Sequence, residues 1–121
     1  MSVAEPLVQA GLLGEAIDRA PDAVLVADES MRYLAVNQAA CRLLGYTREE
    51  LLSLRIDDVA TQPGSAAEYD EMMAQRSKTG TAVLRRKDGT AIPTCYRAHE
   101  TKLAGMTVYV AIIWPEATVD D

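Results

Sequence analysis

The apolar run MTVYVAIIW at residues 106–114 constrains the fold more than any other segment. Its residues are apolar at nearly every position and rich in β-branched and aromatic types, which favours a strand. A strand with one face in water would alternate apolar and polar residues instead. The run therefore predicts a strand buried on both faces. A chain of 121 residues has room for one core around such a strand, so we expect one domain.

The other predicted strands come in two pairs. Residues 23–27 and 33–36 are short apolar runs separated by the turn residues Asp28-Glu29-Ser30. Residues 81–86 and 91–99 flank Lys87-Asp88-Gly89-Thr90, whose Asp-Gly pair is a strong hairpin signal. Because strands that are adjacent in sequence usually pair, we expect one antiparallel sheet.

The first twenty residues are predicted to be helical, with Pro6 in the first turn. Gly11 and Gly14 weaken such a helix, so we expect it to pack on the domain or on a second copy of the chain. The apolar residues expected to share one side of it are Leu7, Val8, Leu12, Leu13 and Ile17.

Two short helices are predicted from their end signals. Asn37 precedes AACRLL and can cap a helix that ends at Gly45. Thr47 and Glu50 have the spacing of a capping box for the next helix.

A longer helix is predicted after the Pro63-Gly64 break. Ser65 and Glu68 repeat the capping-box spacing, and the helix is expected to run through Lys78 and to end at Gly80.

Composition excludes several classes of function. The net charge of −6 disfavours binding to nucleic acid or to anionic lipid. No apolar run approaches the roughly 20 residues of a membrane-spanning helix, so we expect no membrane insertion. Two cysteines are too few for a disulfide scaffold and no secretory signal is visible, so we expect a cytoplasmic protein.

Several of these motifs, in this order, resemble the PAS domain family. The residues that carry the resemblance are Asp28, Asn37, Gly45-Tyr46, Glu50-Leu51 and the Lys-Asp-Gly hairpin at 87–89. The similarity covers residues 14–114. It divides the chain into an N-terminal amphipathic helical segment at 1–13, a PAS domain at 14–114 and an acidic, disordered tail at 115–121.

The resemblance implies an α+β fold: a five-stranded antiparallel sheet of order 2-1-5-4-3, with short helices on one face. PAS domains are sensory or dimerisation modules of histidine kinases, cyclic-dinucleotide enzymes and transcription regulators, and they are not usually catalysts. We therefore expect a role in signal transduction, in a two-component system or in transcription regulation, and not an enzyme.

This chain lacks the residues that bind the cofactors of related sensors. Flavin photosensors carry a reactive cysteine where this chain has Ile56, so we expect no flavin adduct. Haem-binding members use a histidine on the longer helix, which here has none, so haem is not expected. His99 is predicted to face away from the pocket, and Cys41 and Cys95 are predicted to be packing residues. No metal site is predicted.

The resemblance also places an apolar pocket between the sheet and the helices. A small unidentified ligand would lie there, and a core without a cavity is the alternative. The chain has no Phe, which is consistent with either open volume or closer packing. The pocket candidates are Leu25, Ala27, Tyr69, Met72, Met73, Leu84, Thr94, Tyr96, Tyr109 and Ile113. Ala82, Ala98 and Ala111 are expected on the same face.

The opposite face of the last strand is apolar as well, so another surface should cover it. The expected interface of a homodimer comprises Leu7, Val8 and Leu12 of the N-terminal helix and Val108, Val110, Ile112 and Trp114 of the strand. Packing of the helix on its own sheet is the alternative.

The sequence therefore predicts a sensory module that couples a small apolar ligand or a partner to homodimerisation or to an output kinase or regulator domain. A ligand-free interaction module is the alternative within the fold. A small enzyme using the same pocket, with His99 or Glu100 as acid or base, is a third hypothesis. Whether the chain is a fragment cut before an output domain stays open, because it ends IIWPEATVDD without the Asp-Ile-Thr motif that often leads onward.

Overall fold

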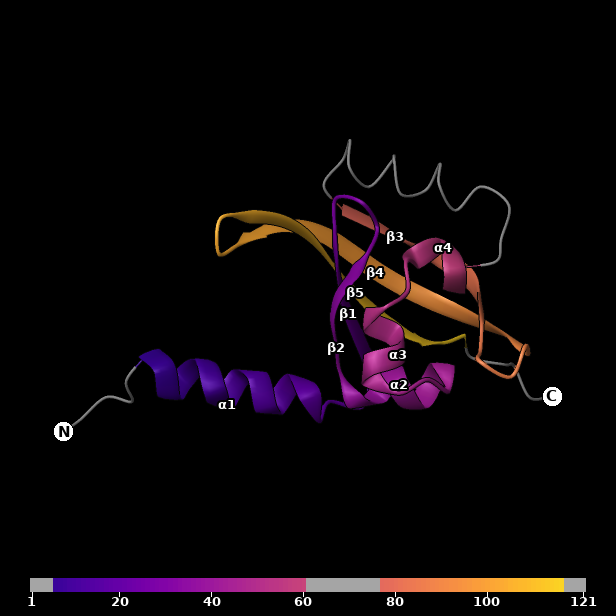
Figure 1. Ribbon diagram of the computed structural model, residues 1–121, viewed down its shortest axis with the longest axis horizontal. Coiled ribbons are helices and arrows are strands. Elements are labelled where there is room, and N and C mark those ends of the chain that lie inside the picture. The colour runs from indigo at the N-terminus through magenta and orange to yellow at the C-terminus, as the bar shows by residue number, and fades with distance from the viewer. Residues whose placement is uncertain (1–5, 61–76, 117–121) are drawn as a thin grey trace.

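The computed structural model describes residues 6–60 and 77–116, which form one antiparallel sheet and four helices (Figure 1). The helices are α1 (Pro6–Asp18), α2 (Gln38–Leu44), α3 (Arg48–Leu52) and α4 (Ile56–Val59). The strands are β1 (Ala23–Asp28), β2 (Tyr33–Val36), β3 (Ser77–Arg85), β4 (Ala91–Leu103) and β5 (Met106–Pro115). The strand order is β2-β1-β5-β4-β3, as predicted.

Strand β5 lies in the middle of the sheet and pairs along both edges. Its register with β1 runs from Ala23 opposite Ile113 to Asp28 opposite Val108. Its register with β4 runs through the whole strand and ends with Leu103 opposite Met106. The prediction that the apolar run forms a strand is confirmed, and the strand is central in the sheet. Burial on both faces is reached at Val108 and Tyr109, whereas residues 110–114 are half-buried.

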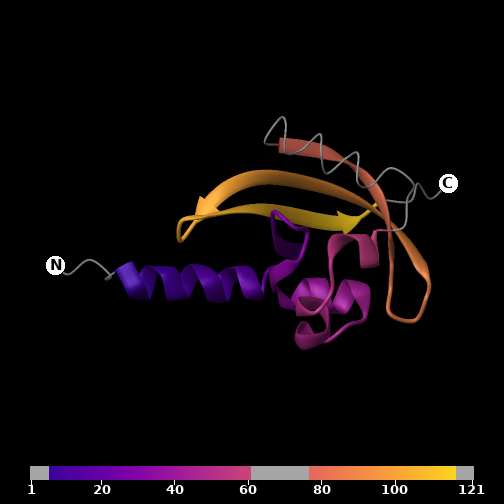
Figure 2. The same cartoon turned by 45° about the horizontal axis from the view of Figure 1, so that its top comes forward.

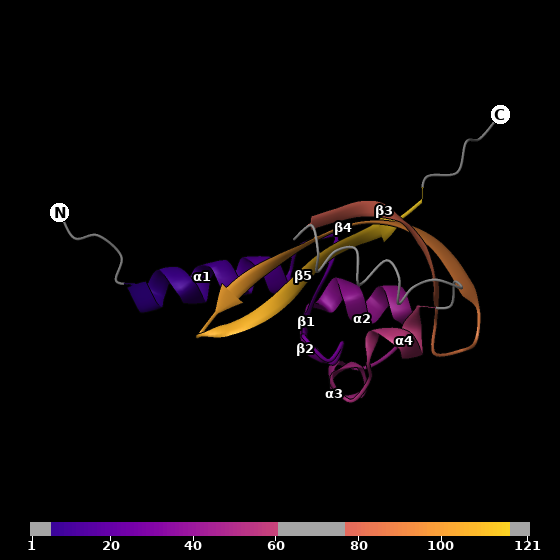
Figure 3. The ribbon, with the colours of Figure 1, turned by 90° about the horizontal axis from the view of Figure 1, so that it is seen from above.

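Helices α2, α3 and α4 lie together over one face of the sheet (Figure 3). The core forms between this helical layer and the inner face, which is the face of the sheet that the helices cover. Its buried apolar residues are Ala23, Leu25, Ala27, Tyr33, Val36, Ala40, Leu44, Leu51, Val59, Leu84 and Ile92. Tyr33 contributes an aromatic ring to these buried residues, which are otherwise aliphatic.

The short helices begin and end at the predicted signals. Gly45 has φ of 79° and its N–H bonds to the carbonyl of Cys41, which closes α2 in the left-handed conformation that glycine adopts freely. Thr47 and Glu50 form a reciprocal capping box at α3.

The prediction that a helix runs through Lys78 is wrong at the C-terminal end of that helix. Residues from Ser77 onward form β3, which pairs with β4 as far as Ser77 opposite His99. Gly80 does not end a helix but lies opposite Tyr96, where a Cβ atom would come within 3.3 Å of the phenol oxygen. The earlier part of the predicted helix, with Ser65 and Glu68, lies outside the described residues.

Helix α1 projects from the domain instead of packing on it (Figures 1 and 2). None of its residues is buried, and Leu7 and Leu12 are 84% and 62% exposed. The expected boundary between residues 13 and 14 falls inside this helix. The alternative that α1 covers its own sheet is therefore wrong for the described chain.

The apolar residues of α1 do not share one side, which corrects the sequence-based expectation. Residues four apart share a helix face, and neighbouring residues point about 100° apart. Val8 and Leu12 consequently form one stripe, and Leu13 and Ile17 form a second. The helix therefore offers two adjoining apolar stripes.

Asn37 holds the N-terminal half of the domain together from a buried position, with 3% of its surface exposed. Its amide oxygen accepts hydrogen bonds from the N–H of Val24 at 2.9 Å and of Ala40 at 3.0 Å. Its amide nitrogen donates to the carbonyls of Ile17 at 2.8 Å and Asp22 at 3.0 Å. One side chain thus joins α1, the segment after it, β1 and α2.

We predict that Asn37→Ala lowers the free energy of unfolding by about 2–4 kcal/mol, because it leaves several buried backbone groups unpaired and removes a helix cap. Urea unfolding followed by circular dichroism measures the loss. The control is Thr47→Ala, which removes an exposed cap and should cost about 1 kcal/mol. Equal losses in the two variants would contradict this account of Asn37.

The turn between β1 and β2 is organised by the carboxylate of Asp28. One oxygen accepts from the N–H of Ser30 at 2.9 Å, the hydroxyl of Ser30 at 2.7 Å and the N–H of Arg32 at 3.1 Å. These bonds, led by the Ser30 hydroxyl, lower the pKa of Asp28 below its ordinary value of 3.8. This geometry agrees with the prediction that Asp28 is a turn residue.

The Asp28 turn should make folding stability acid-sensitive. A carboxyl whose pKa is lowered by folding contributes stability above its unfolded pKa and loses that contribution as the pH falls through the folded value. We expect Asp28→Asn to cost less than about 1 kcal/mol at neutral pH, since the site is exposed, and to cost nothing near about pH 2. Urea unfolding across this range tests it, and a difference that grows on acidification would contradict it.

Candidate functional site

A small cluster on the inner face, toward the β4–β5 hairpin, is the best candidate for a ligand site. Ala98 and Tyr109 are buried there together with Met31, and Tyr96, Ala111 and Ile56 pack against them. We call these six residues the inner cluster. Because Ala98 lies opposite Ala111, two small side chains face each other between the two tyrosines.

The structure brings most of the predicted pocket residues to the inner face. Leu25, Ala27 and Leu84 belong to the main core with Ile113 packed against it, and Tyr96 and Tyr109 belong to the inner cluster. Ala82 packs on the main core as well. The predicted candidates Tyr69, Met72 and Met73 lie outside the described residues.

Thr94 is also on this face, but its hydroxyl already has a partner. The side chain is 1% exposed, and its oxygen donates to the carbonyl of Ala82 at 2.8 Å on the neighbouring strand. A hydroxyl without a partner would have pointed to a polar ligand. The hydrogen bond from the Thr94 hydroxyl instead joins β4 to β3.

Tyr109 is the buried tyrosine of the inner cluster. Burial, together with the nearby charge of Glu100, raises the pKa of its phenol. Glu100 lies directly opposite Tyr109 on β4 and receives its hydrogen bond. The phenol is therefore neutral at physiological pH and its proton is already engaged.

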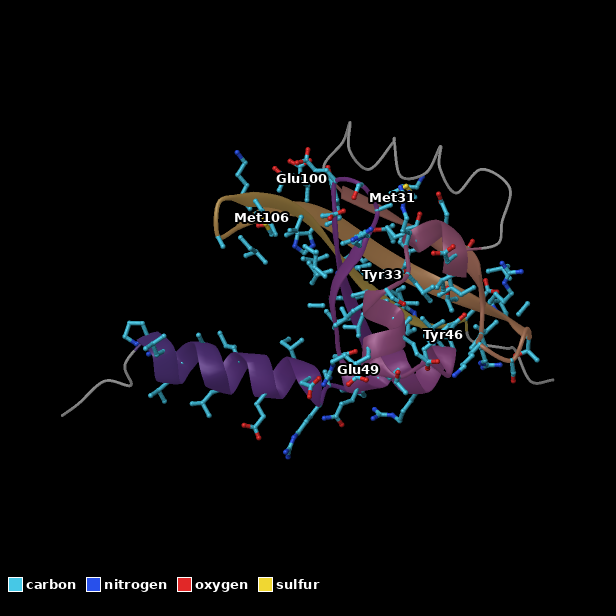
Figure 4. All side chains as sticks on the ribbon, in the orientation of Figure 1. Met31, Tyr33, Tyr46, Glu49, Glu100 and Met106 are labelled. Carbon is cyan, nitrogen blue, oxygen red and sulfur yellow. The ribbon has the colours of Figure 1, made fainter. Side chains whose placement is uncertain are left out.

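Met31 and Glu100 are site residues that the sequence-based reasoning missed as neighbours of Tyr109. Figure 4 shows both side chains at the same side of the molecule, beyond Tyr33. Met31 has a positive φ of 72°, which is uncommon outside glycine, and its carbonyl accepts from the N–H of Ile56 at 2.8 Å. A turn next to a short strand gives no sequence signal that its methionine faces inward.

A shallow groove of about 310 Å³ opens at the other end of the inner face. Among the predicted pocket residues, Ile113 alone contributes to its walls. The groove is lined by Pro21, Asp22, Ala23, Ala39, Arg42, Leu43, Arg86, Ile92, Ile113 and Pro115. It mixes apolar and charged side chains, unlike the apolar pocket that the sequence predicted.

The opposite face of β5, which we call the outer face, is apolar along the strand. Val108 is 1% exposed, and Val110, Ile112 and Trp114 are half-buried. Val24 and Val26 of β1 lie opposite Ile112 and Val110 and extend the surface. The placement of these side chains agrees with the strand alternation on which the predicted interface depends.

The residues proposed for catalysis do not meet. His99 is exposed opposite Val110 on the outer face, whereas Glu100 lies opposite Tyr109 on the inner face. Burial raises the pKa of the Cys41 thiol, which disfavours a nucleophilic role. Within residues 6–60 and 77–116, no three histidine, cysteine or acidic side chains gather as metal ligands. The same part of the chain contains no helix long and apolar enough to cross a membrane.

Solved structures with the same fold are PAS domains. The chain superimposes with a TM-score of 0.84 on a PAS domain from a two-component sensor histidine kinase, at 18% identity, over 93% of this chain and all of that one. The PAS domain of an HTR-like protein from Haloarcula marismortui gives 0.79 at 20% identity, over 89% and 92% of the two chains. A PAS domain from Desulfitobacterium hafniense gives 0.70 at 29% identity, over 84% and 99%.

Sequence comparison gives the same assignment. A search of curated protein sequences found no match to this chain. The sequence profile of the PAS domain, however, matches residues 21–114. This range contains the three helices packed on the sheet and all five strands, apart from the last residue of β5. The chain therefore belongs to the PAS domain family, whose members are typically sensory modules of signal transduction.

Proposed function

We propose that this PAS domain senses a small apolar ligand or a protein partner and passes the signal on through a homodimer. The observation that carries the proposal is a pair of apolar surfaces that reach water: the exposed stripes of α1 and the half-buried outer face of β5 at Val110, Ile112 and Trp114. Water-exposed apolar surface of this extent usually marks an interface.

Helix α1 suits association with a second copy because of its two stripes. One stripe, Val8 and Leu12, can lie on an outer face, while the other, Leu13 and Ile17, contacts the equivalent helix of the partner. A twofold arrangement of this kind would cover both surfaces in both copies. An isolated 13-residue helix is also only marginally stable in water, so a partner would stabilise it.

Strand β5 provides the physical link between ligand and interface. Tyr109 and Ala111 face the inner cluster, and Val108, Val110 and Ile112 alternate with them on the outer face. A ligand that displaces the inner side chains would move the same backbone that carries the outer ones. The two faces of one strand are thus coupled without an intervening segment.

The output would be a kinase or regulator domain in the cytoplasm, reached through association and not through nucleic acid or membrane contact. The similar PAS domain of a two-component sensor histidine kinase supports a kinase as the output partner. No flavin or haem is proposed as the ligand. The side chain at the flavin-reactive position is Ile56, which packs on both clusters and offers no thiol.

We expect the full chain to sediment as a dimer at micromolar concentration. Leu12→Asp should raise the dissociation constant by about 10- to 100-fold, because it places a charge on a stripe that the proposed dimer would bury. The control is Ala91→Asp, which adds the same charge at an exposed site in the β3–β4 hairpin, at the opposite end from α1 (Figure 1). A native chain that stays monomeric would refute the dimer.

The ligand is tested by native mass spectrometry together with an absorbance spectrum. We expect an excess mass of a few hundred daltons, the size of a ligand that fits a small cavity. Ala98→Leu should abolish the excess mass at little cost in stability, because the added side chain would take the volume that a ligand occupies between Tyr96 and Tyr109. Ala91→Leu, at an exposed position of the same strand, is the control.

The second candidate is a ligand-free interaction module. It is favoured by the satisfied polar groups of the inner face: no buried side-chain nitrogen or oxygen in the described part of the chain lacks a partner. In a filled core, Ala98→Leu would cost about 1–3 kcal/mol through overpacking. A clean apo mass with that loss of stability would establish this candidate and exclude the ligand.

A further inference from the structure

The junction between α1 and the domain is held by a set of polar contacts that the motifs of the sequence do not explain. The carboxylate of Asp18, the last residue of α1, receives two donors. The amide of Gln38 donates to one oxygen at 2.8 Å, and a guanidinium nitrogen of Arg48 donates to the other. The donors come from the first residues of α2 and α3, so the end of α1 contacts both helices.

Arg48 is itself fixed on the domain. Its Nε atom donates to the carbonyl of Val36 at 3.2 Å, at the end of β2, while its Nη2 atom bonds to Asp18. The planar guanidinium group presents these donors in a rigid arrangement, so the direction of the contact is defined. Arg48 therefore bridges α1 to the edge of the sheet.

The backbone of α1 is held at the same place. The amide of Asn37 donates to the carbonyl of Ile17 in the last turn of α1, and this carbonyl also accepts from the N–H of Ala20 at 3.2 Å. The same amide donates to the carbonyl of Asp22 just before β1. Side chains of two consecutive residues, Asn37 and Gln38, thus hold both the backbone and the side-chain end of the helix.

Beyond this junction α1 has no buried residue, so packing against the core does not fix its direction there. The helix has 13 residues and is about 20 Å long, at 1.5 Å per residue. A small rotation at the junction would consequently move the far end, with Leu7 and Val8, by several times the displacement near Asp18.

We propose that Asp18, Gln38, Asn37 and Arg48 form a joint that fixes the direction in which α1 leaves the domain, with Arg48 as its positioning residue. Its regulatory consequence rests on the proposed function, because the direction of α1 decides which stripe faces a second copy. Displacement of α2 or α3 would move Gln38 or Arg48 and so redirect the helix. The joint thus links the helical layer over the core to the dimer surface.

Residual dipolar couplings of the backbone amides test the joint directly, since they report the orientation of α1 relative to the sheet. The measurements use the full chain carrying Leu12→Asp, an exposed substitution that keeps association from holding the helix. Without further changes, α1 should share one alignment tensor with β1 and β5. In Asp18→Ala and in Arg48→Ala, the α1 couplings should shrink roughly by half or more, as in a mobile element, while those of the sheet stay unchanged.

The matched control is Glu15→Ala. Glu15 lies on the same helix and forms an exposed ion pair with Arg19 at 3.4 Å, but this pair lies within α1 and its junction and does not reach α2 or α3. The α1 couplings of the Glu15→Ala variant should stay as in the parent. Asp18→Glu, which keeps the charge, should restore part of the alignment, a rescue that a general loss of helix stability would not give.

Unchanged α1 couplings in Asp18→Ala and Arg48→Ala, or couplings already reduced in the parent, would overturn the joint. Sedimentation of the same variants without Leu12→Asp tests the consequence separately: the dissociation constant should rise about 3- to 10-fold, because the partner must now order a freed helix. A native chain that is monomeric while the couplings respond would refute the dimer and leave the joint in place.

Discussion

The two-edged pairing of β5 is the constraint on which the rest of the structure depends. The strand bonds to β1 along one edge and to β4 along the other, so its backbone groups are used inside the sheet and its side chains alone decide what lies on each face. Inward, Tyr109, Ala111 and Ile113 meet the helical layer. Outward, Val110 and Ile112 form an apolar surface on which none of the four described helices packs.

Under the proposed function, this arrangement would place sensing and association on opposite sides of one backbone. The inner cluster contains two small residues, Ala98 and Ala111, between Tyr96 and Tyr109, and so combines limited bulk with defined polar partners. In the proposed dimer, the outer face and the stripes of α1 would supply surface for a second copy. The contacts of Asp18 and Arg48 would then determine how the helix is presented to that copy.

The capped helices and the central strand could be predicted because their signals are local. Asn37, Gly45 and the Thr47–Glu50 pair form their capping bonds within a few residues, as the motifs imply. The bonds of Asn37 to Val24, Ile17 and Asp22 are not local, and its motif does not imply them. The segment at Lys78 and Gly80 misled the prediction because its pairing partner, β4, lies far along the chain. A local glycine signal says nothing about the space that Tyr96 requires opposite it.

The sequence alone determined the family, the strand order that follows from it and the residues on each face of the sheet, since a two-residue alternation and local caps are readable from residue types. Tertiary structure decided the surroundings of each site. It gave Thr94 a partner in Ala82, brought Glu100 against Tyr109 and tied Asp18 to Arg48 across 30 positions of the chain. These contacts depend on how separate elements approach one another in space, and no spacing in the sequence encodes that approach.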